Sequence, residues 1–454
     1  MKPFLPLLLI SSLMPLSADE AKLPSLDEIL LDAKIWENGL ESVKAATEPK
    51  KDEAAEKRSA AAMEELMKQL KEEGYTLASG SEKGFAWLSS QKEGLRARPG
   101  NFKLLGKALG EVVMRGNADS VDTVDISLYN RGDNGEIKAA DFESRYEDWR
   151  KALEEKLGTR GSSRDQRGAV PIRGMMWTKD DSAFLLESSW NKSESRAEFI
   201  RLRMASVSGA RNKTGKVVRR ASLEDNVKKD AAGFTYVDGI PMVDQGEKGY
   251  CVVATVERVG RLYGLEMDQH EMAQLANTTS GGTNGDELEE AFKKVTGKIH
   301  VRTLRLIDYD DKQLNKDMKA YNRLAKKEGA WTMDMDTDEW IINPVWFWSK
   351  ADKEVFRTIK AEQNGCEHFQ RKIKEYVDQG TPLCWTLFLG MFPEKGLPQS
   401  FGGHMRLITG YNYDGDVPKI YYSDSWGEGH HQKTMRLDEA YCMTMGLYAM
   451  VPNR

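Results

Sequence analysis

The spacing of hydrophobic positions divides the chain into a helical start, a strand-rich middle and a mixed second half. Behind a capping-box pattern at Ser25-Leu26-Asp27-Glu28, leucines and Trp36 recur at helical spacing. A stretch rich in Ala, Glu, Lys and Met runs from Lys51 to Glu73 and ends at Gly74, a residue typical of helix C-termini. We therefore expect residues 19–76 to form a helical N-terminal segment.

From about residue 77 the pattern changes to short hydrophobic runs that indicate β-strands. The runs occur at residues 85–88, 112–114, 121–128, 175–177, 184–190 and 199–204. A helical pattern at 142–157 separates the first three runs from the others, and a polar stretch at 160–167 reads as a linker. These patterns predict a β-rich mixed domain over residues 77–210.

Residues 211–232 are polar and short of large hydrophobic side chains, so we expect a linker there. The linker contains the basic pair Arg219-Arg220, where a protease could separate an intramolecular pro-region from the rest of the chain. An ordinary solvated linker is the alternative. Residues 233–454 combine helix and strand patterns and form the second expected domain.

The first residues have the pattern of a secretory signal peptide. Lys2 supplies the positive charge, Pro3 to Leu16 an apolar stretch, and Ser17-Ala18 a small-residue cleavage site. We expect residues 1–18 to be removed and the mature protein to be secreted or periplasmic. No later run is apolar enough to cross a bilayer, so we expect no membrane partner after signal cleavage.

Composition narrows the possible functions. A chain of 454 residues, 40% hydrophobic and 30% charged, has enough apolar material for two or three packed domains. The net charge of −5 provides no global basic field, so we expect no nucleic-acid partner. Four cysteines are too few for a disulfide framework. If one of them is a nucleophile, Cys366, Cys384 and Cys442 allow at most one internal disulfide.

Patterns for metal or cofactor binding are weak. Asp334, Asp336 and Asp338 alternate as at the start of a calcium loop, but Glu339 stands where the sharp turn needs Gly. His430-His431 is an adjacent pair without helical ligand spacing. We therefore expect no metal and no cofactor.

Cys251 begins a long helical pattern, and Gly246 and Gly249 precede it on either side of Lys248. This arrangement predicts a tight, exposed polar loop that presents the thiol at a helix N-terminus, where the helix dipole favours thiolate. Gln245 lies six residues before Cys251, so its amide could join the Cys251 N–H as a second donor to an oxyanion. A buried core cysteine is the alternative.

Two later motifs supply the remaining groups. Gly402-Gly403-His404 precedes a buried-strand pattern, and Asp424 follows another at residues 420–423. A thiol nucleophile needs a base, and the base needs a group that orients it. We therefore predict Cys251 as nucleophile, His404 as base, Asp424 as orienting group and Gln245 as oxyanion donor. A core histidine and a turn-capping aspartate are the alternatives.

Residues 233–454 resemble a papain-like cysteine peptidase, especially the bacterial branch similar to the double-glycine leader peptidases. The resemblance rests on the spacing from Gln245 to Cys251, on Gly402-Gly403-His404, on Lys374 to Leu387 before that motif, and on Asp424-Ser425-Trp426-Gly427. It implies an α+β fold, with a papain-like peptidase domain behind a mixed helical and β N-terminal region.

The activity that the resemblance implies is hydrolysis of peptide bonds in a peptide or protein substrate through a Cys-His-Asp triad. The same constellation also serves other acyl transfers. A cysteine amidase or acyltransferase acting on cell-wall peptides is therefore one alternative. An inactive peptidase-like binding module is another.

Overall fold

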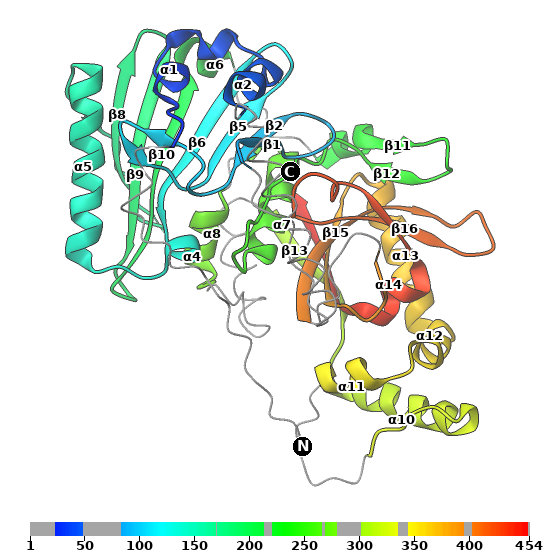
Figure 1. The fold of residues 1–454 in the computed structure, drawn as a ribbon. Coiled ribbons are helices and arrows are strands. Elements are labelled where there is room, and N and C mark those ends of the chain that lie inside the picture. The colour runs from blue at the N-terminus through cyan, green and yellow to red at the C-terminus, as the bar shows by residue number, and fades with distance from the viewer. Residues whose placement is uncertain are drawn as a thin grey trace, which may run out of the picture.

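The structure, a computed structural model, describes residues 23–48, 83–168, 170–212, 220–265, 268–278, 301–334, 344–394 and 402–452. Its helices and strands fall into two parts, each with its own large sheet and hydrophobic core (Figure 1). We call residues 23–212 the N-terminal part and residues 220–452 the C-terminal part. The presence of both helices and sheets confirms the predicted α+β class.

The N-terminal part contains an eight-stranded antiparallel sheet in the order β1-β2-β5-β6-β10-β9-β8-β7. The strands of that sheet are β1 (Phe85–Trp87), β2 (Gly94–Ala97), β5 (Val112–Gly116), β6 (Val121–Asn130), β7 (Ser162–Ser163), β8 (Arg173–Lys179), β9 (Ser182–Asn191) and β10 (Arg196–Ser206). Strands β3 (Lys103–Leu104) and β4 (Lys107–Ala108) pair with each other as a separate two-stranded sheet. The helices of the N-terminal part are α1 (Asp27–Leu30), η2 (Ala33–Glu37), α2 (Leu40–Thr47), α4 (Arg131–Asn134), α5 (Ala139–Leu157) and α6 (Val207–Asn212).

Helix α5 confirms the helical pattern predicted at 142–157. Its buried residues, spaced three or four apart, are Phe142, Tyr146, Trp149, Leu153 and Leu157, so one stripe of the helix faces the sheet (Figure 1). The helix ends where Gly158 adopts the left-handed conformation. The six predicted strand runs also coincide with β1, β5, β6, β8, β9 and β10.

The described start of the chain packs onto this same sheet. Leu26, Leu30 and Leu40 are fully buried in the core that the strands form. Residues 23–48 therefore belong with the β-rich part rather than to a separate helical unit. The helix expected from Lys51 to Glu73 and the expected signal peptide lie outside the described residues.

The C-terminal part contains a second eight-stranded sheet, in which β11-β12-β15-β14-β18-β13 form one path and β16 joins β15 to β17. Its strands are β11 (Val227–Lys229), β12 (Thr235–Val237), β13 (Val301–Asp308), β14 (Leu383–Leu389), β15 (Gly402–Asn412), β16 (Lys419–Ser423), β17 (Lys433–Arg436) and β18 (Thr444–Pro452). Its helices are η3 (Arg220–Asn226), α7 (Cys251–Leu262), α8 (Gln269–Leu275), α10 (Asp311–Glu328), α11 (Pro344–Lys350), α12 (Lys353–Ala361), α13 (Asn364–Asp378) and α14 (Leu437–Met443).

Helix α7 packs against β15 at the centre of the C-terminal part. It is buried nearly all round, with Val253, Val256 and Val259 in the core beside Met405 and Leu407 of β15. An element buried on most sides is fixed more firmly than a surface helix, because many contacts determine its position. This packing places the first residue of α7 beside the first residues of β15.

Parts of both predicted linkers have regular structure. Residues 220–226 form η3, whose Leu223 is fully buried, and β11 pairs with β12 in the second sheet. Residues 162–163 form β7, and Gln166 bridges Ile172. In both segments the backbone pairs with the next strand along the chain, so a polar composition did not exclude a short strand.

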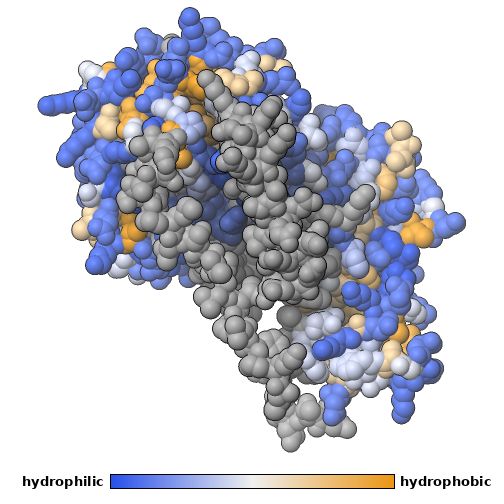
Figure 2. Space-filling view, viewed as in Figure 1, coloured by the Kyte–Doolittle hydropathy of each residue, from blue (hydrophilic) through white to orange (hydrophobic). Residues whose placement is uncertain are grey.

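Hydrophilic side chains predominate on the face of the molecule drawn in Figure 2, over both parts of the chain. Within the described residues, no helix combines the length and hydrophobicity that crossing a bilayer requires.

Gly380 offers a test of how η3 is fixed. It has φ +71°, and a Cβ there would lie 2.0 Å from the Leu223 carbonyl oxygen. Gly158 also has φ +71°, but a Cβ there would meet no described atom within 4 Å. Gly158→Ala should therefore lower the free energy of unfolding by about 1 kcal/mol, the conformational cost alone. Gly380→Ala should lower it by at least about 2 kcal/mol more, as measured by urea unfolding. Equal losses of unfolding free energy in the two variants would show that η3 moves away from the added methyl group at no cost.

Candidate active site

The structure brings three of the predicted residues together. Cys251 is the first residue of α7, His404 lies near the start of β15, and Asp424 directly follows β16. Strands β15 and β16 pair with Leu407 opposite Ser423, so His404 and Asp424 meet at one end of this ladder. His404 Nε2 lies 2.7 Å from Asp424 Oδ1, and the His404 side chain is hydrogen-bonded to the Cys251 thiol. Because Nε2 faces the carboxylate, Nδ1 is the ring nitrogen left for sulfur.

The pKa values of Cys251 and His404 are both shifted in the direction that favours the charged form of each side chain. Burial alone would raise the pKa of the Cys251 thiol, but the hydrogen bond and the charge of His404 outweigh it and lower that pKa. Burial alone would likewise lower the pKa of His404, whereas the hydrogen bonds to Asp424 and Cys251 raise it to about 9. Relative to the isolated side chains, the arrangement therefore shifts both groups toward a thiolate beside an imidazolium.

Asp424 is fully buried and held by cations that sequence reasoning did not find. Arg406 Nε forms an ion pair with Asp424 Oδ2 at 2.9 Å, and Arg258 Nη1 donates to the Asp424 carbonyl oxygen at 2.9 Å. Burial would raise the pKa of Asp424, but Arg406 and His404 lower it, so the carboxylate stays ionised. The sequence did contain a signal for this pairing. His404 and Arg406 are two residues apart on one strand, so their side chains lie on the same face of the sheet.

An aromatic ring covers the imidazole. Trp426 stacks on His404 with ring centroids 4.6 Å apart and an angle of 22° between the rings. His404 is consequently 9% exposed. Shielding from water strengthens both hydrogen bonds of the ring, because the local dielectric constant falls. Trp426 therefore supports the orientation of His404 from a third direction.

Gln245 lies in the loop of residues 244–250 before α7, which we call the nucleophile loop. Its backbone N–H donates to the Ser425 carbonyl oxygen at 2.8 Å, and its side-chain Nε2 donates to the Lys248 carbonyl oxygen at 3.3 Å. An amide nitrogen carries two hydrogens, so this bond leaves one for an oxyanion. Gln245 is buried, which suits a fixed donor.

The turn after Asp424 interlocks with this loop. Gly427 has φ +80°, and a Cβ there would lie 2.6 Å from Asp244 Oδ2. Glycine is therefore required by its conformation and by the close approach of Asp244. The Asp424-Ser425-Trp426-Gly427 motif thus positions the nucleophile loop as well as the imidazole.

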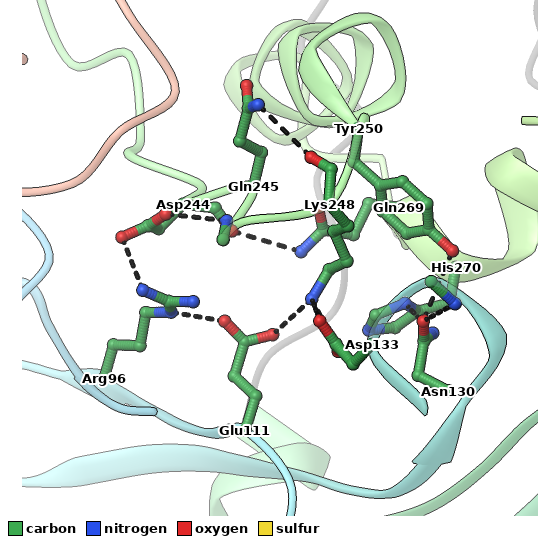
Figure 3. A network of polar contacts seen from close by, with 12 residues as sticks. Arg96, Glu111, Asn130, Asp133, Asp244, Gln245, Lys248, Tyr250, Gln269 and His270 are labelled. Atoms are coloured by element: carbon green, nitrogen blue, oxygen red, sulfur yellow. Dashed lines mark hydrogen bonds and ion pairs between the residues drawn. The ribbon is translucent and has the colours of Figure 1, made fainter. Parts of the chain in front are cut away.

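The expectation of an exposed nucleophile loop is wrong. Lys248 is 3% exposed, and the N-terminal part covers it (Figure 3). Its Nζ lies 2.9 Å from Asp133 Oδ2 and 3.4 Å from Glu111 Oε2. From the sequence, the glycines and the lysine predicted a solvated loop. The two acidic partners of Lys248 lie more than a hundred residues away in sequence, so the local pattern gave no sign of them.

All four cysteines are free thiols, and three are buried away from the triad. Burial raises the pKa of Cys366 to about 11 and that of Cys384 to about 12. The pKa of Cys442 is also raised, by burial. Cys251 therefore differs from every other cysteine in the direction of its pKa shift. In the described part of the chain, no group of three or more His, Cys, Asp or Glu side chains could hold a metal ion.

Trp348 is buried and packs on Phe388, whereas Trp346 is 47% exposed. Asp336 and Asp338, which alternate with Asp334 as in a calcium loop, lie outside the described residues.

Comparison with known proteins gives one family match. Residues 307–445 match the model of the Peptidase_C39 like family, a range that includes His404 and Asp424 and begins after Cys251. No curated protein matches the chain. The matched range lies within the C-terminal part, so the resemblance to cysteine peptidases is confirmed there. Part of the C-terminal half, residues 307–445, is thus similar to the Peptidase_C39 like family, and this similarity suggests a cysteine peptidase.

Proposed function

We propose that the C-terminal part hydrolyses peptide bonds with Cys251 as nucleophile, His404 as acid and base, Asp424 as orienting group and Gln245 as oxyanion donor. The observation that carries the proposal is the continuous contact from the Cys251 thiol through His404 to the buried Asp424, with the thiol pKa lowered. A merely structural cysteine in a core has its pKa raised, as Cys384 does.

The chemistry follows from these groups. The Cys251 thiolate attacks the carbonyl carbon of a peptide, and the carbonyl π electrons move to oxygen. The Cys251 N–H and the free Gln245 amide hydrogen stabilise this oxyanion. The tetrahedral intermediate then collapses, the C–N bond breaks, and His404 gives its proton to the leaving amine. His404 next removes a proton from water, which attacks the thioester and releases the carboxylate product and Cys251.

The proposed substrate is a peptide or protein chain, and the proposed site of action is outside the cytoplasm. The second proposal rests on the signal-peptide pattern of residues 1–18, which lie outside the described residues.

Replacing the nucleophile tests the proposal most directly. Cys251→Ala should abolish hydrolysis of a mixed peptide library, because no other described thiol contacts His404. Gln245→Ala should lower kcat about 10²–10³-fold and leave KM nearly unchanged, since an oxyanion donor acts in the transition state. The matched control is Cys366→Ala, which removes a buried thiol outside the site and should keep kcat within about twofold. Hydrolysis by Cys251→Ala at the wild-type rate would refute the assignment.

The pKa shifts predict different pH profiles for hydrolysis and for alkylation. His404 has a raised pKa, so its imidazolium persists below about 9 and is lost as the pH rises through that value. Hydrolysis needs this proton for the leaving amine, so kcat/KM should rise through the lowered pKa of Cys251 and fall near pH 9. Alkylation needs only thiolate and should not fall on the alkaline side.

Mass spectrometry after brief iodoacetamide treatment at pH 6 should find label on Cys251 and on none of the other three cysteines. His404→Ala should remove this selectivity. Equal labelling of Cys251 in wild type and in His404→Ala would show that the imidazole does not activate the thiol.

A further inference from the structure

The nucleophile loop contains little that would hold its own shape. Gly246 has φ +70° and Gly249 follows, so the backbone passes through two residues of high conformational freedom. Asp244 accepts a hydrogen bond from the Gly246 N–H at 2.8 Å, which closes one turn of the loop. The loop must nevertheless place Gln245 and the Cys251 N–H to within a fraction of an ångström for oxyanion binding.

The Lys248 carbonyl oxygen is the point that organises the loop. It accepts from Gln245 Nε2 at 3.3 Å and from the Tyr250 N–H at 2.7 Å. The first bond aims the amide of the oxyanion donor, and the second forms the turn that leads into α7. A shift of the Lys248 backbone would therefore move both groups that bind the oxyanion.

The Lys248 side chain is anchored in the N-terminal part. Its buried ammonium lies between Glu111, the residue just before β5, and Asp133 on α4, as Figure 3 shows. Burial would raise the pKa of Glu111, but Lys248 and Arg96 lower it to about 2, so this anchor stays charged. A buried ammonium is strongly disfavoured away from its partners, so these carboxylates fix where Lys248 can lie.

Two further contacts fix the ends of the loop to the same part of the chain. Arg96 on β2 forms an ion pair with Asp244 Oδ2 at 2.9 Å and also pairs with Glu111. At the other end, the Tyr250 hydroxyl donates to Asn130 Oδ1 at 3.3 Å. Gly132 packs so close that a Cβ on it would lie 2.9 Å from the Tyr250 ring. Because Cys251 directly follows Tyr250, these contacts fix the backbone just before the nucleophile.

We infer that the N-terminal part is a positioning domain of the active site, in which Glu111 and Asp133 hold Lys248 and thereby set the geometry of Gln245 and of the turn before Cys251. The inference rests on the proposed function for its effect on catalysis. It assigns residues 83–134 a lasting role in the enzyme, which differs from that of an inhibitory pro-region removed on maturation. Glu111, Asp133 and Lys248 are positioning residues, since the chemistry passes through Gln245 and Cys251.

The first experiment uses the full-length chain with Glu111→Gln and Asp133→Asn combined. These changes keep side-chain size and remove the charges that anchor Lys248. We expect kcat to fall about tenfold or more with KM within about threefold, because a displaced oxyanion donor weakens transition-state binding alone. The matched control is Ser189→Ala, which removes a 2.7 Å hydrogen bond to Gln274 of α8 across the same two parts but away from the loop. The control should keep kcat within about twofold.

A second variant keeps the test informative if loss of charge unfolds the chain. Gly132→Ala alters no charge and pushes a methyl group toward the Tyr250 ring. It should also lower kcat while thermal denaturation remains cooperative. Selective alkylation of Cys251 at pH 6 should persist in it, because His404 on β15 and Asp424 just after β16 lie outside the loop.

Amide hydrogen exchange separates this inference from the proposed function. Peptides covering residues 244–250 should exchange faster in the Glu111→Gln/Asp133→Asn variant and in Gly132→Ala than in wild type, and Ser189→Ala should match wild type. Faster exchange together with an inactive wild type would support the positioning role and refute the proposed peptidase. An active wild type whose two loop-directed variants keep kcat within twofold and unchanged loop exchange would overturn the inference.

Discussion

The packing of α7 against β15 is the contact on which the rest of the structure depends. It places a thiol from the middle of the chain beside an imidazole about a hundred and fifty residues later, and neither group is reactive alone. Buried valines of α7 and the apolar core of β15 make this contact, so the same apolar surface that stabilises the C-terminal part also sets the geometry of the site. Function here is a direct result of core packing.

Around this contact, buried charged side chains form ion-pair networks rather than isolated pairs. Asp424 joins His404 to Arg406, and Arg406 in turn pairs with Glu394. Glu111 similarly joins Arg96 to Lys248 at the border between the two parts. Burying a single unpaired charge costs free energy, so each network favours one arrangement of the helices and strands that carry its residues. The network around Asp424 fixes the base His404, and the network around Glu111 fixes the loop before the nucleophile.

The elements with strong local patterns could be predicted from the sequence. The start of α7 at Cys251, the strand after His404 and the turn at Asp424 all follow from short segments whose periodicity decides their conformation. The burial of Lys248 could not, because its acidic partners are more than a hundred residues away in sequence. The pairing of Arg406 with Asp424 could not either, because it depends on how β15 and β16 align. Tertiary contacts, which a local pattern does not contain, decided these cases.

The order of strands in the second sheet has a consequence for synthesis on the ribosome. Helix α7 emerges early, whereas β15 pairs with β14, which itself pairs with β18, the last strand described. The part of the sheet around the imidazole is thus complete only after β18, near the end of the described residues, has been translated. The imidazole itself is translated about 150 residues after the thiol, so the two groups can meet only late in synthesis.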